Sequence, residues 1–153
     1  MTVANILKGK RNGVLTVQPT QTIAALAERL RSAGVGVMVV SSDGKSLEGI
    51  ISERDVAYGV AVHGGALPTL KVSDLMTPVV ITCSPGDTIA EVAKIMTMQR
   101  IRHLPVKDGA KLVGVISIGD VLKSRISEIQ LEANVLRDIA ITRSHTTSAR
   151  PWA

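Results

Sequence analysis

The sequence is duplicated, and this duplication constrains the fold more than any other feature. GIISERD at residues 49–55 recurs as GVISIGD at residues 114–120, an offset of 65 residues (114 − 49 = 65). PTQTIAALA at residues 19–27 recurs as PGDTIAEVA at residues 85–93, an offset of 66 residues (85 − 19 = 66). Similar segments in the same order indicate that one structural unit occurs twice. We therefore expect two halves with the same fold.

Each half has the pattern of a β-α-β-β-α unit. A short extended stretch comes first, and Thr22 or Thr88 then takes the N-cap position of an amphipathic helix. Two short apolar runs follow, joined by loops with Asp-Gly turn signals, and a second helix begins after Ser52 or Ser117. The expected strands are residues 14–17, 37–40 and 47–51 in the first half, and residues 79–83, 104–106 and 112–116 in the second.

Neither unit buries its apolar surface alone, because one small sheet with helices on a single face leaves the other face open to water. We therefore predict an α/β (α+β) fold in which the two units pack sheet to sheet with pseudo-two-fold symmetry, plus a C-terminal helix. The expected division is a first unit with the N-terminal segment at 1–66, a second unit at 67–125, a helical extension at 126–142 and a flexible tail at 143–153, with the Gly-rich stretch 62–70 as the linker.

The composition argues against several classes of protein. Hydrophobic residues make up 45% of the 153 residues, which is enough for a core, but there is no Phe and only Trp152 and Tyr58 are aromatic. The net charge of +5 permits an anionic ligand. Proteins that bind single-stranded nucleic acid stack bases on aromatic side chains, so the near absence of these side chains argues against a nucleic-acid partner.

The single cysteine, Cys83, excludes a disulfide within the chain and suits a reducing compartment. It lies in the apolar run VVITCS, which favours a buried structural thiol over a nucleophile. The N-terminus has no signal-peptide pattern, and no apolar run has the length of a membrane span. We therefore expect a cytoplasmic protein without a membrane partner.

No sequence pattern of an enzyme is present. The chain has neither a Gly-rich phosphate-binding loop of the Walker A type nor a nucleophile elbow, so we expect no catalytic activity and no catalytic cofactor. His63 and His145 have no metal-ligand spacing to other residues, so we expect no metal site.

Two β-α-β-β-α units, each with glycine, an apolar residue and Ser-x-x-Asp after the third strand, resemble a tandem CBS-domain pair, also called a Bateman module. The resemblance covers roughly residues 1–125 and is strongest in RIRHLPV at 100–106 and LVGVISIGDV at 112–121. The chain is most similar to the small stand-alone bacterial members of this family. The resemblance implies a regulatory module that binds an adenosine ligand between the units. The implied ligands are AMP, ADP or ATP, with NAD(H) or S-adenosylmethionine as further possibilities. It also implies a homodimer, whose regulated protein the sequence leaves open.

The resemblance implies that Asp55 and Asp120 bind ribose, because a carboxylate has two acceptor oxygens for the neighbouring hydroxyls. Ser52 and Ser117 would offer hydroxyls beside helix N-termini, where phosphate is favoured. Replacing Asp120 by Ala should then weaken binding about ten- to a hundredfold. The same Ser-x-x-Asp pattern also describes a capping box, which stabilises a helix by about 1 kcal/mol without any ligand. Both interpretations can hold at once.

The second unit carries a basic cluster, RIRH at residues 100–103, that the first unit lacks. Residues 35–38, about 65 positions earlier, are uncharged. Arginine binds phosphate through paired charged hydrogen bonds, and the resemblance places such residues at Arg102 and His103 near the nucleotide phosphates. The alternative is a solvated arginine pair beside a packed histidine. Strict strand alternation would point Arg102 and His103 to opposite faces. Arg54 is a further phosphate candidate or a surface helix residue.

Because there is no Phe, adenine would lie between aliphatic side chains. Thr16 and Thr82 are expected near the mouth of the cleft, although they equally suit a β-strand without any ligand. The candidates for the aliphatic slot, proposed as a set, are Val17, Ile51, Val80, Pro105, Val106 and Ile118. The complete set of candidate ligand-binding residues is Thr16, Ser52, Arg54, Asp55, Thr82, Arg100, Arg102, His103, Pro105, Ser117, Ile118 and Asp120.

The last predicted helix is longer than the repeat requires. Its apolar residues alternate spacings of four and three, as in a coiled coil. They are Leu122, Ile126, Ile129, Ala133, Leu136 and Ala140. Such a helix either lies on its own domain or contacts a second protein. The second choice leads to an alternative function, a dimeric interaction scaffold whose nucleotide sites are vestigial.

Overall fold

The computed structural model describes residues 1–10, 13–78 and 81–147 of the chain. The first unit forms a three-stranded sheet in the order β1-β2-β3, with β1 parallel and β3 antiparallel to β2. Its elements are β1 (Thr16–Val17), α2 (Ile23–Ala33), β2 (Val37–Val40), β3 (Gly49–Ser52) and α3 (Glu53–His63).

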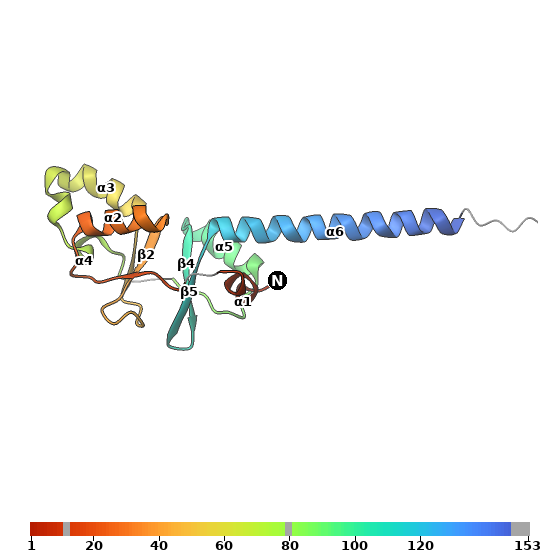
Figure 1. Ribbon diagram of the computed structural model, residues 1–153, viewed down its shortest axis with the longest axis horizontal. Helices are drawn as coiled ribbons and strands as arrows, with labels where there is room; N and C mark the ends of the chain where they lie inside the picture. Colours follow the sequence, from red (N-terminus) through yellow and green to blue (C-terminus); the bar gives the residue numbers. More distant parts are fainter. Residues whose placement is uncertain (11–12, 79–80, 148–153) are drawn as a thin grey trace, which may run out of the picture.

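The second unit repeats this arrangement with a shorter first strand. Only Cys83 of the predicted strand 79–83 pairs with the sheet, through one parallel bridge to Val106, and residues 79–80 lie outside the described residues. The antiparallel pair of β4 and β5 supplies the rest of the sheet. The elements are α5 (Ile89–Gln99), β4 (His103–Asp108), β5 (Lys111–Ser117) and α6 (Ile118–Thr147). The predicted class, a mixed α+β fold of two small sheets and a final helix, is confirmed (Figure 1).

The first long helix of each unit begins at the predicted residue. Thr22 Oγ1 accepts a hydrogen bond from the backbone N–H of Ala25 at 3.2 Å, and Thr88 Oγ1 accepts one from Glu91 at 3.1 Å. A threonine hydroxyl at this position satisfies a backbone donor that the helix itself leaves unpaired. The caps fix the first residues of α2 and α5. They therefore help to position β2 and β4, which follow these helices.

The short helices that precede the units cross over between them. α1 (Val3–Lys8) packs on the second unit, where the N–H of Val3 donates to the carbonyl of Asp87 at 2.9 Å. α4 (Val72–Leu75) packs on the first unit, where the N–H of Val72 donates to the carbonyl of Gln21 at 2.8 Å. Each unit therefore completes its core with a helix from elsewhere in the chain, which ties the two units together.

The predicted linker is structured. α3 runs to His63, and the chain continues as a 3-10 helix, η1 (Gly64–Thr69). Leu67 of η1 is only 5% exposed and belongs to the first core. An apolar side chain that gains this burial holds its backbone in place, so glycine content alone was a poor guide to a flexible connection here.

Two separate aliphatic cores lie behind the sheets. The first gathers residues of β1, α2, β2, β3, η1 and α4, and the second gathers residues of α1, α5, β4, β5 and α6. Cys83 lies in the second core, where burial raises the pKa of its thiol to about 11. The prediction of a buried structural thiol is confirmed, since a protonated thiol is a poor nucleophile.

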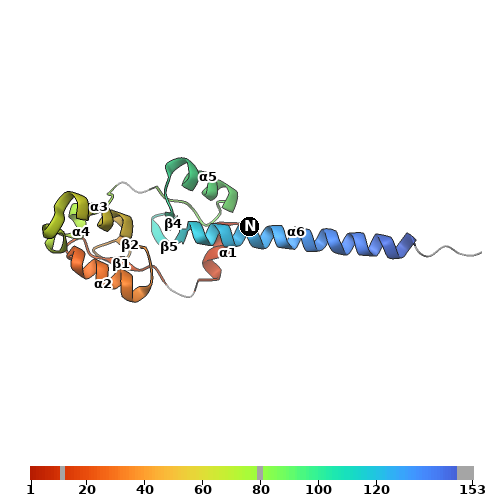
Figure 2. The same ribbon diagram turned by 90° about the horizontal axis from the view of Figure 1, so that it is seen from above.

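α6 gives the molecule its elongated shape. Its first turns lie against the second unit, and the rest of the helix extends away from both units (Figures 1 and 2). From Ile129 to His145 every side chain of α6 is exposed, so the helix does not lie on its own domain there. The helix continues to Thr147, whereas the sequence pattern predicted its end at residue 142, and residues 148–153 lie outside the described residues.

No helix in the described part of the chain combines the length and hydropathy needed to cross a membrane.

Candidate functional site

The end of β3 forms a capping box at the start of α3. The N–H and Oγ of Ser52 donate to Oδ2 of Asp55 at 2.8 and 3.1 Å, and the N–H of Asp55 donates to Ser52 Oγ at 3.4 Å. The cap uses one carboxylate oxygen. Among the described residues, no group donates a hydrogen bond to the other oxygen, Oδ1, so the capping role leaves acceptor capacity for a ligand hydroxyl.

The end of β5 forms the same box, but with an additional cation. The N–H and Oγ of Ser117 donate to Oδ2 of Asp120 at 2.8 and 3.0 Å. Nζ of Lys10 lies 2.7 Å from the same oxygen and donates to the carbonyl of Val115 at 2.8 Å. Burial raises the pKa of Asp120, but the hydrogen bond and charge of Lys10 and the bonds from Ser117 outweigh it, so the pKa lies below its usual value. This carboxylate is already neutralised within the chain.

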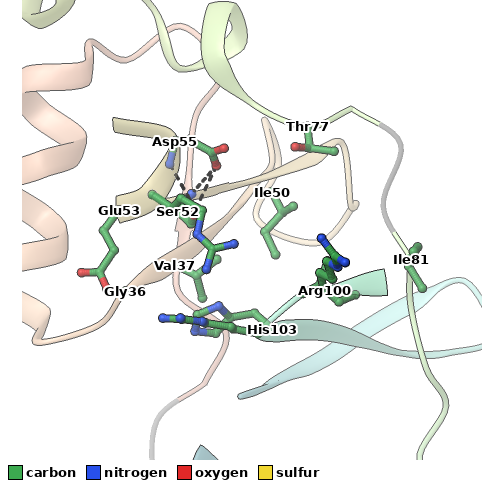
Figure 3. A pocket seen from close by; sticks show the side chains of 13 residues that line it. Gly36, Val37, Ile50, Ser52, Glu53, Asp55, Thr77, Ile81, Arg100 and His103 are labelled. Carbon is green, nitrogen blue, oxygen red and sulfur yellow. Dashed lines mark hydrogen bonds between the residues drawn. The ribbon is translucent and has the colours of Figure 1, made fainter. Parts of the chain in front are cut away.

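The first cleft is a cavity of about 290 Å³ between the units. The first unit contributes Ser52 and Asp55, and the second unit contributes Arg100 and His103 on the opposite wall (Figure 3). Arg54 and Arg102 also line it. Three arginines therefore face a cavity that contains a carboxylate with an unused oxygen, which is an arrangement suited to an anion that also carries hydroxyl groups.

The second cleft is a cavity of about 580 Å³ on the other side of the unit interface. Ser117 of the second unit lines it together with Lys10, whereas Asp120 is not part of its wall. The opposite wall comes from the first unit and contains Gly34, Gly36 and Val37, with no charge. His103 borders both clefts. Each cleft thus takes its strand end from one unit and its facing wall from the other.

Strand pairing corrects the sequence alignment of the basic cluster. His103 pairs with Ser117, and Val37 pairs with Ser52. The offset between the facing walls is therefore 66 residues (103 − 37 = 66), not 65, because the hairpin of the first unit is one residue longer. In the second unit, Arg100 therefore occupies the position that Gly34 has in the first. Arg102 likewise corresponds to Gly36, and His103 corresponds to Val37.

Arg100 has an unusual backbone conformation. It ends α5 with φ at +54°, in the left-handed region, and Gly34 ends α2 with φ at +65°. Left-handed backbone is free of strain for glycine but costs other residues about 1–2 kcal/mol. The first unit has glycine at this C-cap, which adopts the left-handed conformation without strain, whereas the second unit has Arg100. Residues with strained backbone conformations concentrate at functional sites.

Arg102 and His103 line the same cavity, so the expectation that they point to opposite faces was wrong. The reason is that β4 begins at His103, which leaves Arg102 outside the alternating strand. Burial lowers the pKa of His103, and the charges of Lys10 and Arg102 lower it further, whereas Glu53 and Asp120 oppose the change. His103 is therefore mainly neutral near neutral pH.

Five of the sequence candidates lie outside the walls of both clefts, and Asp120 is one of them. Thr16 borders a separate polar cavity beside Arg29 and Asp43. Thr82, Pro105 and Ile118 are in the wall of neither cleft, although the carbonyl of Pro105 accepts the N–H of Cys83 at 3.0 Å and the N–H of Ile118 donates to the carbonyl of Arg102 at 2.8 Å. These two backbone contacts position the second unit's half of the first cleft.

The aliphatic walls differ from the predicted set. Val17, Ile51 and Val106 are at most 1% exposed and belong to the cores, so their assignment to an adenine slot was wrong. Val80 lies outside the described residues. The apolar side chains that line the first cleft are Val37, Ile50, Ile81 and Ile101. Those that line the second cleft are Leu7, Val14, Leu15, Val35, Val37, Val113 and Val115.

Lys10 is a charged residue of the second cleft that the sequence analysis missed. VANIL at residues 3–7 matches VSDLM at 72–76 with an offset of 69 (72 − 3 = 69), whereas the next helices have an offset of 66. The stretch around Lys10 is therefore three residues longer than its counterpart (69 − 66 = 3), and it is basic, KGKR.

Within the described residues no cluster of His, Cys, Asp and Glu side chains could hold a metal ion.

Residues 5–61 and 72–127 each match the family model of the CBS domain. The chain belongs to the CBS-domain family. Each matched segment contains all strands of one unit, so the chain is a tandem CBS pair. The family assignment made from the duplicated sequence is thereby confirmed.

Curated relatives support the same assignment. The chain is 31% identical to a CBS domain-containing protein of Bacillus subtilis, over 74% of this chain and 80% of the relative. It is 31% identical to a mitochondrial CBS domain-containing protein of Arabidopsis thaliana and 33% identical to a protein of Methanopyrus kandleri, and it spans 66% and 58% of their respective lengths. An inosine-5′-monophosphate dehydrogenase of Rhodopirellula baltica matches over only 22% of its own length.

Solved structures share the fold of this CBS pair. A CBS-domain protein of Agrobacterium tumefaciens is 38% identical with a TM-score of 0.79, covering 82% of this chain and 99% of the other. A signal-transduction protein with CBS domains from Burkholderia ambifaria is 37% identical with a TM-score of 0.77, covering 83% and 95%. A CBS domain protein of Pyrobaculum aerophilum, complexed with AMP, is 25% identical with a TM-score of 0.68, covering 78% and 89%.

Proposed function

We propose that this CBS pair is a regulatory sensor of an adenosine ligand and that the ligand binds in the first cleft. The observation that carries the proposal is the position of Asp55, whose free oxygen shares one cavity with Arg54, Arg100 and Arg102. The carboxylate would accept the ribose hydroxyls, and the arginines would bind the phosphate. The AMP complex of the relative from Pyrobaculum aerophilum supports this choice of ligand class.

The size of the first cleft favours a mononucleotide. Its volume of about 290 Å³ lies at the lower end of the range for small-molecule sites, about 300–1,000 Å³. AMP suits a site of this size better than NAD(H), which carries a second nucleotide. ADP and ATP would place additional phosphates beside the exposed arginines. The adenine ring would lie against Ile50 and Ile81, since the wall offers aliphatic side chains only.

The second cleft has a weaker claim. Lys10 already binds Asp120, and the facing wall consists of Gly34, Gly36 and Val37 rather than basic residues. Lys10 contacts Oδ2 of Asp120, the oxygen that the cap already uses, but it neutralises the carboxylate, which lies outside the wall of this cleft. A phosphate would find only Lys10 and His103 nearby. We therefore expect one ligand per chain at low ligand concentration.

Isothermal titration with AMP, ATP, NADH and S-adenosylmethionine in parallel tests the proposal. We expect AMP to bind best, and Asp55→Ala to weaken its binding about ten- to a hundredfold through the loss of charged hydrogen bonds. Asp120→Ala is the matched control, because it removes the same capping box from the other unit. Its affinity should stay near that of the wild type, which replaces the loss expected for this variant from the sequence alone, because Asp120 lines neither cleft. Equal losses in both variants would overturn the assignment to the first cleft, and no heat with any ligand would overturn the sensor.

The second candidate function is a dimeric interaction scaffold with vestigial nucleotide sites. The neutralised Asp120 and the exposed apolar face of α6 favour it. The two functions differ in what removal of the helix does. Truncation after Glu128 should abolish partner binding by a scaffold, whereas a ligand sensor should keep its affinity for the nucleotide.

A further inference from the structure

Beyond Glu128, α6 carries large apolar side chains into solvent. Ile129, Leu131 and Leu136 are 62%, 65% and 66% exposed, on a helix that touches neither unit there (Figures 1 and 2). Exposed apolar surface of this extent on one element marks an interaction site. Most of the stability of a helix in a protein comes from packing of its apolar face rather than from helix propensity, so a packing partner would stabilise this part of α6.

Six apolar residues form a straight line on α6, which we call the seam. Their spacings of four and three place them at the a and d positions of a heptad repeat. The seam consists of Leu122, Ile126, Ile129, Ala133, Leu136 and Ala140. Val121, Ser124 and Glu128 face the second unit from a different side of the helix. The seam is therefore open along its whole length, including its start beside the body, where Leu122 is 56% and Ile126 is 54% exposed.

The other apolar residues on α6 do not form a comparable line. Leu131, Val135 and Ile139 follow each other at steps of four. Each such step rotates by about 40° around a helix of 3.6 residues per turn, so these side chains spiral away from any single partner helix. Only the seam can contact one straight neighbour over several turns.

The charges beside the seam indicate the partner and its direction. Glu132 occupies a g position and Arg137 occupies the e position five residues later. In a parallel pair of identical helices, Glu132 of each copy faces Arg137 of the other, which gives two attractive contacts. In an antiparallel pair with the same seam in contact, Glu132 of one copy would face Glu132 of the other. Lys123 of one copy would face Arg137 of the other. Like charges in these positions are unfavourable.

We infer that α6 binds α6 of a second copy of this chain as a parallel two-stranded coiled coil along residues 122–140. The seam supplies the buried apolar contacts, and Glu132 and Arg137 select the parallel direction. Both bodies then lie at the same end of the coil. This inference does not depend on the ligand, because no seam residue borders either cleft.

Two matched variants test the seam in the full-length protein. Ile129→Lys places a charge in the seam, and Leu131→Lys places the same charge at an equally exposed position outside it. Sedimentation equilibrium should show a wild-type dimer, a dissociation constant raised more than about a hundredfold by Ile129→Lys, and little change for Leu131→Lys. A monomeric wild type, an unaffected Ile129→Lys, or equal dissociation by both variants would overturn the inference.

Disulfide trapping tests the direction. Ala140→Cys lies in the seam near the far end of α6, and the native Cys83 is only 4% exposed and does not compete. Mild oxidation should link Ala140→Cys chains into covalent dimers, because a parallel coil sets the two residues opposite each other. Ile141→Cys, one residue outside the seam, should link poorly. Equal linking of both variants, or none with Ala140→Cys, would contradict a parallel pair.

Discussion

The two clefts begin from the same strand end and differ in the walls that face it. In the first cleft, the Ser52–Asp55 box faces Arg100, Arg102 and His103 of the other unit. In the second, the equivalent box faces two glycines and a valine, and Lys10 covers its carboxylate. The capping box starts a helix in both units and therefore has a structural role in each. The side chains of the facing walls differ between the units, and this difference supports the assignment of the ligand to the first cleft.

The largest change in AMP affinity is expected when the basic wall of the first cleft is replaced by the uncharged residues that face the second cleft. The double variant Arg102→Gly, His103→Val reproduces the residues of the first unit at the matching positions. We expect AMP affinity to fall about a hundredfold, because two phosphate-binding groups are lost. Titration calorimetry measures the change. Arg125→Ala, which removes one positive charge that pairs with Glu128 on α6, should leave the affinity within about twofold.

Removal of Lys10 should make the two clefts more alike. Lys10→Met removes the cation that neutralises Asp120, and we expect a second AMP to bind, more weakly than the first by about tenfold, because the facing wall still lacks arginine. The stoichiometry measured at high ligand concentration should rise from one to two. Stability should fall by no more than about 1 kcal/mol, since the lost ion pair is partly exposed. An unchanged stoichiometry would contradict the view that the charge of Lys10 keeps a ribose away from Asp120.

His103 predicts a pH dependence specific to the first cleft. Its pKa in the folded protein lies below the ordinary value of 6.5, because burial disfavours the charged form. The unfolded chain therefore binds the proton more readily, and the stability that His103 contributes is lost as the pH falls from about 6.5 through the lowered pKa. A bound phosphate favours the charged form, so AMP affinity should rise severalfold from about pH 8 to 6.

The variant His103→Gln separates this effect from the titration of the ligand itself. Affinity and thermal unfolding measured across the same pH range should show a smaller pH dependence than in the wild type. Parallel profiles for the two proteins would show that another group titrates.

The smallest expected effect concerns the backbone of Arg100. Arg100→Gly gives α5 the C-cap that α2 already has, and we expect the free energy of unfolding to rise by about 1 kcal/mol while AMP affinity falls severalfold. Gly34→Arg is the reciprocal variant, and it should lower stability by a similar amount without affecting the first cleft. Chemical denaturation measures both. A loss of stability in Arg100→Gly would mean that the arginine side chain stabilises the fold more than its backbone strains it.

Much of this architecture could be predicted from the sequence. The duplication gave the two units, and Thr22 and Thr88 marked the helix starts because N-caps are local features. The alternation within strands was harder to use. Ile50 and Ile51 are both apolar, and only the pairing of β3 with β2 shows that Ile51 enters the core while Ile50 faces the cleft. A shift of one residue exchanges the two faces of a strand.

Three further features could not be predicted because they depend on contacts distant in sequence. Each cleft is formed by residues of both units, so the basic cluster of the second unit faces Asp55 of the first unit and not Asp120 of its own. Lys10 reaches Asp120 across 110 positions of the chain (120 − 10 = 110). The crossing of α1 and α4 between the units likewise has no local signal.

α6 begins directly after Ser117, which lines the second cleft, and runs without interruption to the far end of the molecule. Asp120 stands in its first turn, and the whole helix spans 30 residues, Ile118–Thr147. A helix of that length extends about 45 Å, so a tilt of about 10° at its base moves its tip by about 8 Å. The helix therefore has the geometry of a lever arm, in which a small rotation of the first turn becomes a displacement of several ångströms at the tip.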